Sequence, residues 1–302
     1  MTIQENVVPF ESQASRGAVI RSDRLIGAIL ADEGKLTPTE IDRTLQLQRD
    51  IGIRFGEAAV QLGFISDNDV RFALAKQFDF PLLVPDFESK GIQPSKELVA
   101  AFAPFHPRTE EMRALRTQLL IRWYNPQQGK NALVVASPEG AEGRSYVAAN
   151  LAVVFSQLGA RTLLIDADLR KPRQHEIFGL PPGQGLSSLL SGRTDKQAQF
   201  PVHGLNRLTV LPAGPLPPNP QELLSRPAFT ALMKDLQAHY DVVIIDSPPA
   251  KKYADTQSIA YRAGDVLMIA RKDHTSVAST SKVLKELAGT GARVVGTIVN
   301  SY

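Results

Sequence analysis

Five short apolar runs, separated by segments with helical periodicity, constrain the fold of this chain more than any other feature. They are residues 132–136, 162–166, 242–246, 266–270 and 293–299. Each run is apolar almost throughout, without alternation, which is typical of strands buried on both faces of a parallel sheet. The pattern predicts an α/β fold in residues 106–302, with a parallel sheet that carries helices on both faces.

The composition is that of a globular protein large enough for two domains, with 302 residues, 34 basic and 31 acidic side chains. The net charge of +3 does not argue for a nucleic-acid partner. The chain has no cysteine, which excludes disulfides and thiolate metal sites, and its five histidines are scattered without the spacing of metal ligands. No apolar run approaches the roughly 18 residues needed to cross a bilayer. We therefore expect a soluble, cytoplasmic protein that reaches the inner membrane only through a partner.

An internal repeat occupies the N-terminal part of the chain. Residues 1–20 show no sustained period and are expected to form a flexible arm. After them, a pattern that begins at Gly27 recurs at Gly56, an offset of 29 residues. Each copy is expected to form a short helix, a glycine stop and a second helix. We predict a small all-helical domain over residues 21–83, followed by a proline-punctuated linker over 84–105.

The second helix of each copy has its own start signal. In the first copy, Thr37 is placed to cap the helix and Glu40 stands where a capping box requires an acid. Ser66 and Asp69 repeat this spacing in the second copy. Both signals predict helices that begin directly after the capping residue.

A glycine-bearing loop follows the first apolar run and leads into a predicted helix over residues 146–158. A loop of this kind directs backbone N–H groups at phosphate, and the helix dipole adds a favourable field. Ser145 stands where a hydroxyl group ligates Mg²⁺, Arg144 stands where the standard phosphate loop has lysine, and Pro138 replaces the first glycine. A surface turn that caps a helix is the alternative. The candidate nucleotide-binding residues of the loop are Gly140, Ala141, Glu142, Gly143, Arg144, Ser145 and Tyr146.

Acidic side chains follow two other apolar runs. Asp166, Asp168 and Arg170 come at the end of the second run, and Asp246 ends the third. In open α/β sheets, ligands bind outside the carboxyl ends of the strands. Each aspartate alone could be a helix cap or a turn residue, but together with the loop they predict a site for a cation and a triphosphate.

These motifs together resemble the bacterial tyrosine kinase family that controls chain length in exopolysaccharide synthesis, in particular its subgroup from exosortase-type polysaccharide operons. The resemblance covers residues 106–302, a P-loop NTPase-like domain. It is carried by the phosphate loop at 137–145, the Asp-x-Asp-x-Arg motif at 166–170 and the apolar-Asp-Ser-Pro-Pro motif at 244–249, with further matches at 218–224 and 110–116.

The resemblance implies an ATP- and Mg²⁺-dependent protein-tyrosine kinase acting with a membrane chain-length determinant. By this resemblance, Ser145, Asp168 and Asp246 hold Mg²⁺, and Asp166 is the candidate base toward a tyrosine hydroxyl. Arg170 and Arg144 would neutralise phosphate charge. Two further sets of residues have implied roles: Asn300 would contact the nucleotide base, and Glu110, Arg113 and Arg116 would form a homo-oligomerisation element. The alternatives are a strand-end turn for Asn300 and a solvated helix face for the other three.

Two departures from the family pattern keep a second hypothesis open. Arginine at position 144 is longer, planar and forked compared with lysine, and the chain ends at Asn300-Ser301-Tyr302 without a tyrosine cluster. Both favour a non-catalytic switch, in which ATP binding changes the contact with the membrane partner. The rival class of partitioning ATPases has a second lysine in its phosphate loop where this chain has Glu139, which counts against that class.

The N-terminal repeat is similar to the N-terminal domain of type II secretion and pilus ATPases. Some copies of that domain bind cyclic di-GMP through paired Arg-Leu-Gly motifs. The second copy keeps Arg54 and Gly56, whereas the first has Leu25 at the aligned position and Arg24 one residue earlier. The resemblance therefore leaves two alternatives, a cyclic di-GMP site or a plain docking domain.

Overall fold

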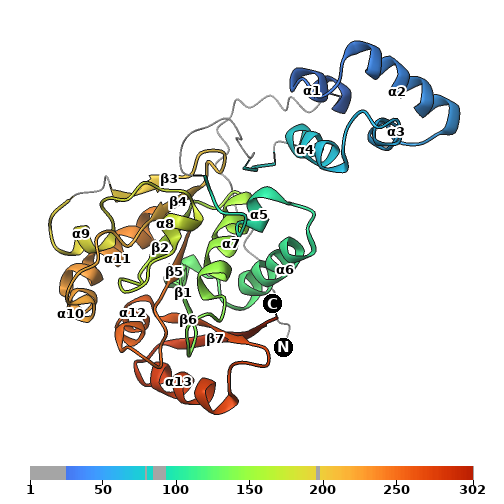
Figure 1. Cartoon of the computed structure of the whole chain (residues 1–302). Coiled ribbons are helices and arrows are strands. Elements are labelled where there is room, and N and C mark those ends of the chain that lie inside the picture. The colour runs from blue at the N-terminus through green and yellow to red at the C-terminus, as the bar shows by residue number, and fades with distance from the viewer. Residues whose placement is uncertain (1–24, 79, 84–92, 195–197, 302) are drawn as a thin grey trace. The chain divides into compact units, whose positions relative to one another are not determined.

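The computed structural model describes residues 25–78, 80–83, 93–194 and 198–301, and its chain is shown in Figure 1. It divides into two compact units, residues 1–80 and 81–302, which are described separately. The expected arm over residues 1–20 lies outside the described residues. Among those that are described, no helix has both the length and the apolar character needed to span a membrane.

In the part of the first unit that the structure describes, four helices surround a small apolar core. They are α1 (Ile26–Asp32), α2 (Pro38–Ile51), α3 (Phe55–Gln61) and α4 (Asp67–Gln77). The two predicted capping boxes are confirmed, because Thr37 and Ser66 each accept a hydrogen bond from the backbone N–H three residues later and the acid at that position bonds back. The core contains Ile29, Leu30, Leu36, Ala59, Ile65 and Ala73.

The second unit is built on a seven-stranded sheet, in the order β3-β4-β2-β5-β1-β6-β7. The strands are β1 (Ala132–Ala136), β2 (Thr162–Asp166), β3 (Phe200–Pro201), β4 (Leu208–Leu211), β5 (Val242–Asp246), β6 (Asp265–Arg271) and β7 (Arg293–Asn300). All neighbours are parallel except β3 and β4, which pair antiparallel. The predicted parallel α/β fold and its five strands are thus confirmed, and β3 and β4 are additional.

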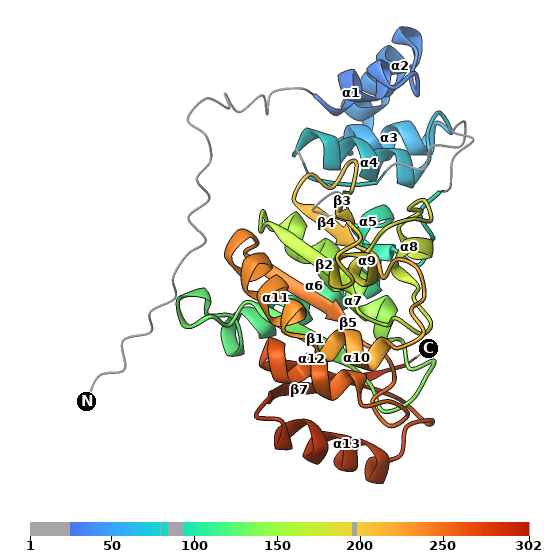
Figure 2. The ribbon, with the colours of Figure 1, turned by 90° about the vertical axis from the view of Figure 1, so that its left-hand side faces the viewer.

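Helices cover both faces of this sheet, as Figures 1 and 2 show. The helices of the unit are α5 (Val99–Phe102), α6 (Pro107–Arg122), α7 (Arg144–Gln157), α8 (Gln174–Ile177), α9 (Leu186–Leu190), α10 (Pro220–Ser225), α11 (Pro227–His239), α12 (Asp255–Ala263) and α13 (Val277–Gly289). Successive residues of β1 point to opposite faces: Leu133 joins a core with α7, and Val134 joins a core with α12. Both faces of the sheet are therefore shielded from water by helices, and this is why the strands have continuous apolar sequences.

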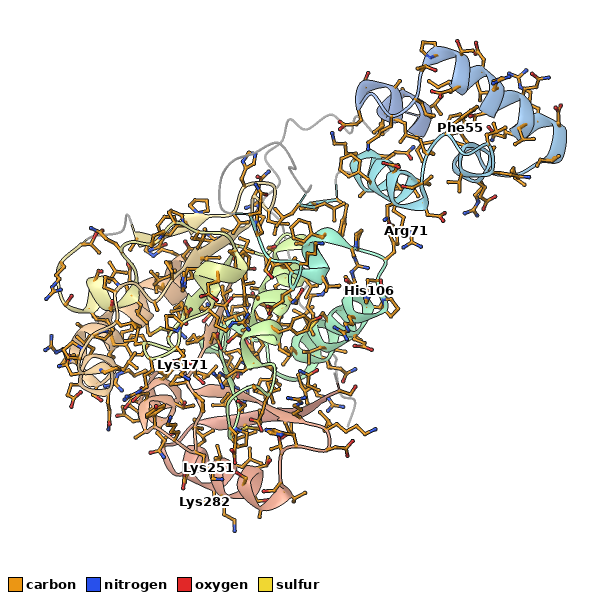
Figure 3. The ribbon with its side chains drawn as sticks, in the orientation of Figure 1. Phe55, Arg71, His106, Lys171, Lys251 and Lys282 are labelled. Carbon is orange, nitrogen blue, oxygen red and sulfur yellow. The ribbon has the colours of Figure 1, made fainter. Side chains whose placement is uncertain are left out.

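Two helices begin earlier than the sequence pattern indicated. Residues 109–123 have the sequence pattern of an amphipathic helix. The helix formed there, α6, starts at Pro107, because the ring of His106 (labelled in Figure 3) accepts a hydrogen bond from the N–H of Arg108. Proline at the first helical position needs no hydrogen-bond partner for its nitrogen. The expected helix over 146–158 starts at Arg144, so that two residues of the phosphate loop already belong to its first turn.

The C-terminal half of the expected linker over 84–105 packs into the second unit. Leu98, Ala100 and Ala101 are fully buried. The buried side chain of Asn150 in α7 holds this segment, since it accepts from the N–H of Ala100 at 2.9 Å and donates to the C=O of Glu97 at 2.9 Å. This part of the chain therefore helps to fix α7, the helix that carries the phosphate loop.

Candidate functional site

The phosphate loop connects β1 to α7 at the carboxyl edge of the sheet. Gly143, the residue before the helix, has φ +87°, and Ala141 has φ +58°, a left-handed conformation that costs a residue with a Cβ about 1 kcal/mol or more. Strain of this kind persists only where the surrounding contacts fix the backbone. The loop is thus held in a shape that places its amides before the N-terminus of α7.

A buried carboxylate braces the loop from inside. Glu142 is 1% exposed, and it accepts a hydrogen bond from the N–H of Glu139 at 2.8 Å and another from the hydroxyl of Thr275. At the end of β7, the amide of Asn300 donates to the C=O of Glu142 at 3.2 Å, and at the end of β6, Arg271 donates to the C=O of Ala141 at 3.2 Å. In this structure the amide of Asn300 therefore supports the phosphate loop, and its contact with a nucleotide base stays a prediction.

The strand register explains why the aspartates meet the loop. Asp166 in β2 is paired with Asp246 in β5, and Val135 of β1 is paired with Asp246. The loop leaves β1 one residue later. Three neighbouring parallel strands therefore deliver the phosphate loop and both acids to one edge of the sheet.

Asp166 is fully buried, and both of its oxygens are engaged by the loop that follows β2. Oδ1 accepts the N–H of Asp168 at 3.2 Å, while Oδ2 accepts those of Arg173 at 3.0 Å and Gln174 at 2.9 Å. Burial raises the pKa of Asp166 well above its ordinary value, and the charge of Asp246 raises it further. Asp166 thus organises residues 168–174 as well as bearing a carboxylate of unusual basicity.

Arg144 reaches back from the first turn of α7 into this acidic cluster. Its guanidinium donates to the hydroxyl of Ser137 at 2.7 Å and lies 3.4 Å from one oxygen each of Asp168 and Asp246. The pKa of Asp246 is raised by burial, which outweighs the lowering by Arg144 and by the hydroxyl of Ser145. The side chains named as metal ligands, Ser145, Asp168 and Asp246, are therefore grouped around Arg144.

Mg²⁺ fits this group of side chains by the chemistry of their oxygens. Asp246 Oδ1 is buried and accepts no hydrogen bond from the part of the chain that the structure describes. The described residues contain no cluster of three or more histidine, cysteine or acidic side chains arranged to hold a metal ion by themselves. Mg²⁺ does not need such a cage, because it is usually bound by one or two carboxylates together with phosphate oxygens and water.

Arg170 is positioned by residues that the sequence analysis missed. It forms a two-pronged ion pair with the fully buried Asp255, at 2.7 and 3.1 Å, and its guanidinium lies 3.9 Å from the ring centre of Tyr253. Asp255 opens α12, nine residues after Asp246, and no spacing rule connects it to Arg170. The rigid placement of Arg170 therefore depends on packing and could not be read from the motif.

A cleft of about 1380 Å³ lies over the phosphate loop, and Arg170 and Tyr146 are among the residues that line it. Basic side chains outside the motifs also line it, among them Lys171, Lys251 and Lys252. Lys171 and Lys251, labelled in Figure 3, come from the loops after β2 and β5. Lys251 pairs with Glu139 at 2.7 Å, so the acid that distinguishes this loop from the partitioning ATPases has a local cationic partner. The sequence signal for this lining was a pair of basic residues within five or six positions of two strand ends, Arg170-Lys171 after β2 and Lys251-Lys252 after β5.

The residues named as an oligomerisation element lie along α6. Arg113 forms an ion pair with Glu110, and Arg116 donates to the C=O of Val154 in α7 at 2.8 Å. Burial lowers the pKa of Arg116. Arg116 therefore packs against its own unit, and the role of these residues in assembly stays a prediction. So does cyclic di-GMP binding, because Arg24 lies outside the described residues and Arg54 is an exposed residue before α3.

Comparisons with known proteins identify the group to which these features belong. A family model described as ParA, NUBPL iron-transfer P-loop NTPase, matches residues 128–301. The putative tyrosine-protein kinase CapB of Staphylococcus aureus is 33% identical over 192 residues, which are 64% of this chain and 83% of CapB. The tyrosine-protein kinase YwqD of Bacillus subtilis is 34% identical, over 70% of this chain and 89% of YwqD.

The solved structures agree with the sequence relatives. The chimerical protein CapA2B2 superposes with a TM-score of 0.64 at 33% identity, and covers 75% of this chain and 96% of its own. Some relatives are much longer: the match covers 27% of the putative tyrosine-protein kinase EpsB of Ralstonia nicotianae. The likeness therefore concerns the nucleotide-binding unit.

Proposed function

Because the chain belongs to the bacterial tyrosine kinase family, we propose that it transfers the γ-phosphoryl group of ATP to tyrosine hydroxyl groups. The observation that carries this proposal is the strand register, which brings Asp166 and Asp246 to the sheet edge at which the phosphate loop leaves β1. Phosphoryl transfer depends mainly on positioning and on charge neutralisation. A loop for the phosphates and acids for a metal, on one sheet edge, supply both.

Each side chain then has a distinct task. Ser145, Asp168 and Asp246 would hold Mg²⁺, which when bound neutralises charge on the phosphate oxygens. The amides of residues 140–146 bind the phosphates, and Arg170 adds a fixed positive charge. Asp166 accepts the proton of the tyrosine hydroxyl, a task that suits a carboxylate whose pKa burial has raised above its ordinary value, because the higher pKa makes it a stronger base.

We place this activity in the control of exopolysaccharide chain length, polymerisation and export, with a membrane chain-length determinant as partner. The exosortase-type resemblance of the motifs at 137–145, 166–170 and 218–224 supports this assignment. In this role the protein would be cytoplasmic and would be recruited to the inner membrane by that partner. Glu110, Arg113 and Arg116 would contribute to a homo-oligomer. The N-terminal unit would be either a plain docking domain or a cyclic di-GMP site that includes Arg54. Titration calorimetry with cyclic di-GMP, on wild type and an R54A variant, would decide between these two roles.

A second candidate function is favoured by one observation. Arg144 occupies the carboxylates that a metal would need, and it stands where transferring enzymes of the family carry lysine. In this alternative, the protein is a switch that binds ATP without transferring phosphate and changes its contact with the membrane partner.

Mass spectrometry of phosphotyrosine, after incubation of the full-length chain with Mg-ATP, separates the two functions. The D168N variant removes a proposed metal ligand, and D241N is the matched control, because Asp241 pairs with Arg161 at the start of β5 and β2, the opposite ends of these strands from Asp246 and Asp166. The kinase proposal expects phosphotyrosine in wild type and D241N and none in D168N. Magnesium-dependent ATP binding without phosphotyrosine in any sample, even with the partner's cytoplasmic segment present, would establish the switch instead.

A further inference from the structure

Each of the two proposed metal-binding carboxylates has only one oxygen left for a further ligand. Asp168 Oδ1 accepts the N–H groups of Arg170 at 3.1 Å and Lys171 at 2.9 Å. Asp246 Oδ2 accepts the side-chain amide of Gln174 at 2.8 Å. The remaining oxygens, Asp168 Oδ2 and Asp246 Oδ1, are those that a cation could use.

Both of these oxygens face the guanidinium of Arg144. Nη2 lies 3.4 Å from Asp168 Oδ2, and Nε lies 3.4 Å from Asp246 Oδ1. The Arg144 side chain is only 8% exposed, so that it fills the space between the two acids instead of extending over the loop toward solvent. A metal ion bonded to the same two oxygens at the 2.0–2.1 Å typical of Mg²⁺ would have to take the place of this guanidinium.

The contacts of the Arg144 guanidinium with Asp168 and Asp246 are long, so that little binding energy holds the guanidinium between the two acids. Charge-assisted N–H···O bonds are typically about 2.7–2.9 Å long, whereas both carboxylate contacts of Arg144 measure 3.4 Å. Among the described residues, neither Arg144 Nε nor Asp246 Oδ1 has a hydrogen-bond partner of good geometry. The one short bond, at 2.7 Å, goes to the neutral hydroxyl of Ser137. A phosphate group, which accepts two parallel bonds from a guanidinium, offers better partners than these acids do.

We propose that Arg144 is an internal counter-ion that occupies Asp168 and Asp246 in the nucleotide-free protein and excludes divalent metal until phosphate arrives. The proposal rests on the metal-ligand roles assigned under the proposed function. When a nucleotide enters, the guanidinium moves to the terminal phosphates and frees the two oxygens. Metal and nucleotide then bind together, and free metal does not load the empty site. A lysine would do this less well, because its compact ammonium group lacks the wide planar fork by which the guanidinium spans both acids.

Binding of Mn²⁺ to the nucleotide-free chain, measured by the loss of the free-ion signal in electron paramagnetic resonance, tests the proposal without any catalytic readout. We expect weak binding by wild type and at least about tenfold tighter binding by R144Q, equivalent to about 1.4 kcal/mol. R144K, which keeps the charge but not the fork, is expected to fall between the two. The double variant R144Q/D246N should return to weak binding, because the site itself is then lost.

Fluorescence of Trp123, the only tryptophan and 2% exposed, verifies that each variant is folded. If R144Q does not fold, the Mn²⁺ affinities of R144K and wild type are compared instead. If Arg144 excludes the metal as proposed, R144K should bind Mn²⁺ more tightly than wild type. Equal Mn²⁺ affinity in wild type and the folded Arg144 variants would overturn the inference. A chain without phosphotyrosine but with the expected order of Mn²⁺ affinities would refute the kinase proposal and leave the counter-ion in place.

Discussion

Replacing Asp166 with asparagine should change the pH dependence of stability in a direction that the structure fixes. Burial and the neighbouring Asp246 raise the pKa of Asp166 above the ordinary aspartate value of 3.8. The folded state therefore holds a proton that the unfolded chain has lost. The contribution of Asp166 to stability is full below the unfolded pKa and is lost as pH rises through the folded pKa.

The magnitude follows from linkage. Between the two pKa values, wild type loses up to about 1.4 kcal/mol per pH unit relative to an asparagine that does not titrate. For a folding unit of about 150–250 residues, 1 kcal/mol corresponds to about 2–4 °C in Tm. The difference in Tm, wild type minus D166N, should therefore fall by about 3–5 °C per pH unit above pH 4 and level off at the folded pKa.

Scanning calorimetry of both proteins from pH 4 to pH 8 measures this difference, and the titrating groups that do not interact with Asp166 cancel to first order. D241N is a control of opposite sign. Burial acts to raise the pKa of Asp241, but the hydrogen bonds and charge of Arg161 bring it below the ordinary value. Its contribution is full above the unfolded pKa of 3.8 and is lost only as pH falls below that value, so that its Tm difference should stay nearly constant from pH 5 to pH 8 and should not fall as pH rises. A D166N difference that stays constant or increases would refute our account of the buried acid.

Two further substitutions test the packing that supports the site. G185A should destabilise the protein by about 1–3 kcal/mol in urea denaturation, because a Cβ at Gly185 would lie 2.2 Å from the C=O of Pro212; an unchanged midpoint would contradict this close approach. N150A should cost about 3 kcal/mol, since it leaves the N–H of Ala100 and the C=O of Glu97 without their buried partner. Denaturation followed by Trp123 fluorescence measures it, and a loss below about 0.5 kcal/mol, within the range of ordinary surface changes, would show that water replaces the amide.

The sheet could be predicted where its strands are buried on both faces. The runs at 132–136, 162–166 and 242–246 are strands with those same limits. A strand covered by helices on both sides is apolar on both faces, so that its limits are visible against the more polar segments around it. β4 was missed because it has four residues and includes Thr209, and β3 because it has two, one of them proline. Strands this short carry too little periodicity to be distinguished from loops.

The positions of the site motifs could be predicted, but the partners of their side chains could not. Parallel strands bring their carboxyl ends to one edge, and this places Asp166 and Asp246 side by side. Spacing does not reveal that Arg144 turns inward to Asp168 and Asp246, because rotamers depend on the finished packing. For the same reason, the burial of Leu98 within an apparent proline-rich linker became visible only in the fold.

The central claim is that the loop at 137–145 and the aspartates across from it form one site for magnesium and a triphosphate. Isothermal titration calorimetry of the full-length chain with ATP, in magnesium and in EDTA, tests it most directly. We predict binding that is at least about tenfold tighter with magnesium, equivalent to about 1.4 kcal/mol, and that this gain disappears in D246N. No binding of ATP in magnesium, or an equal gain in D246N, would contradict the claim.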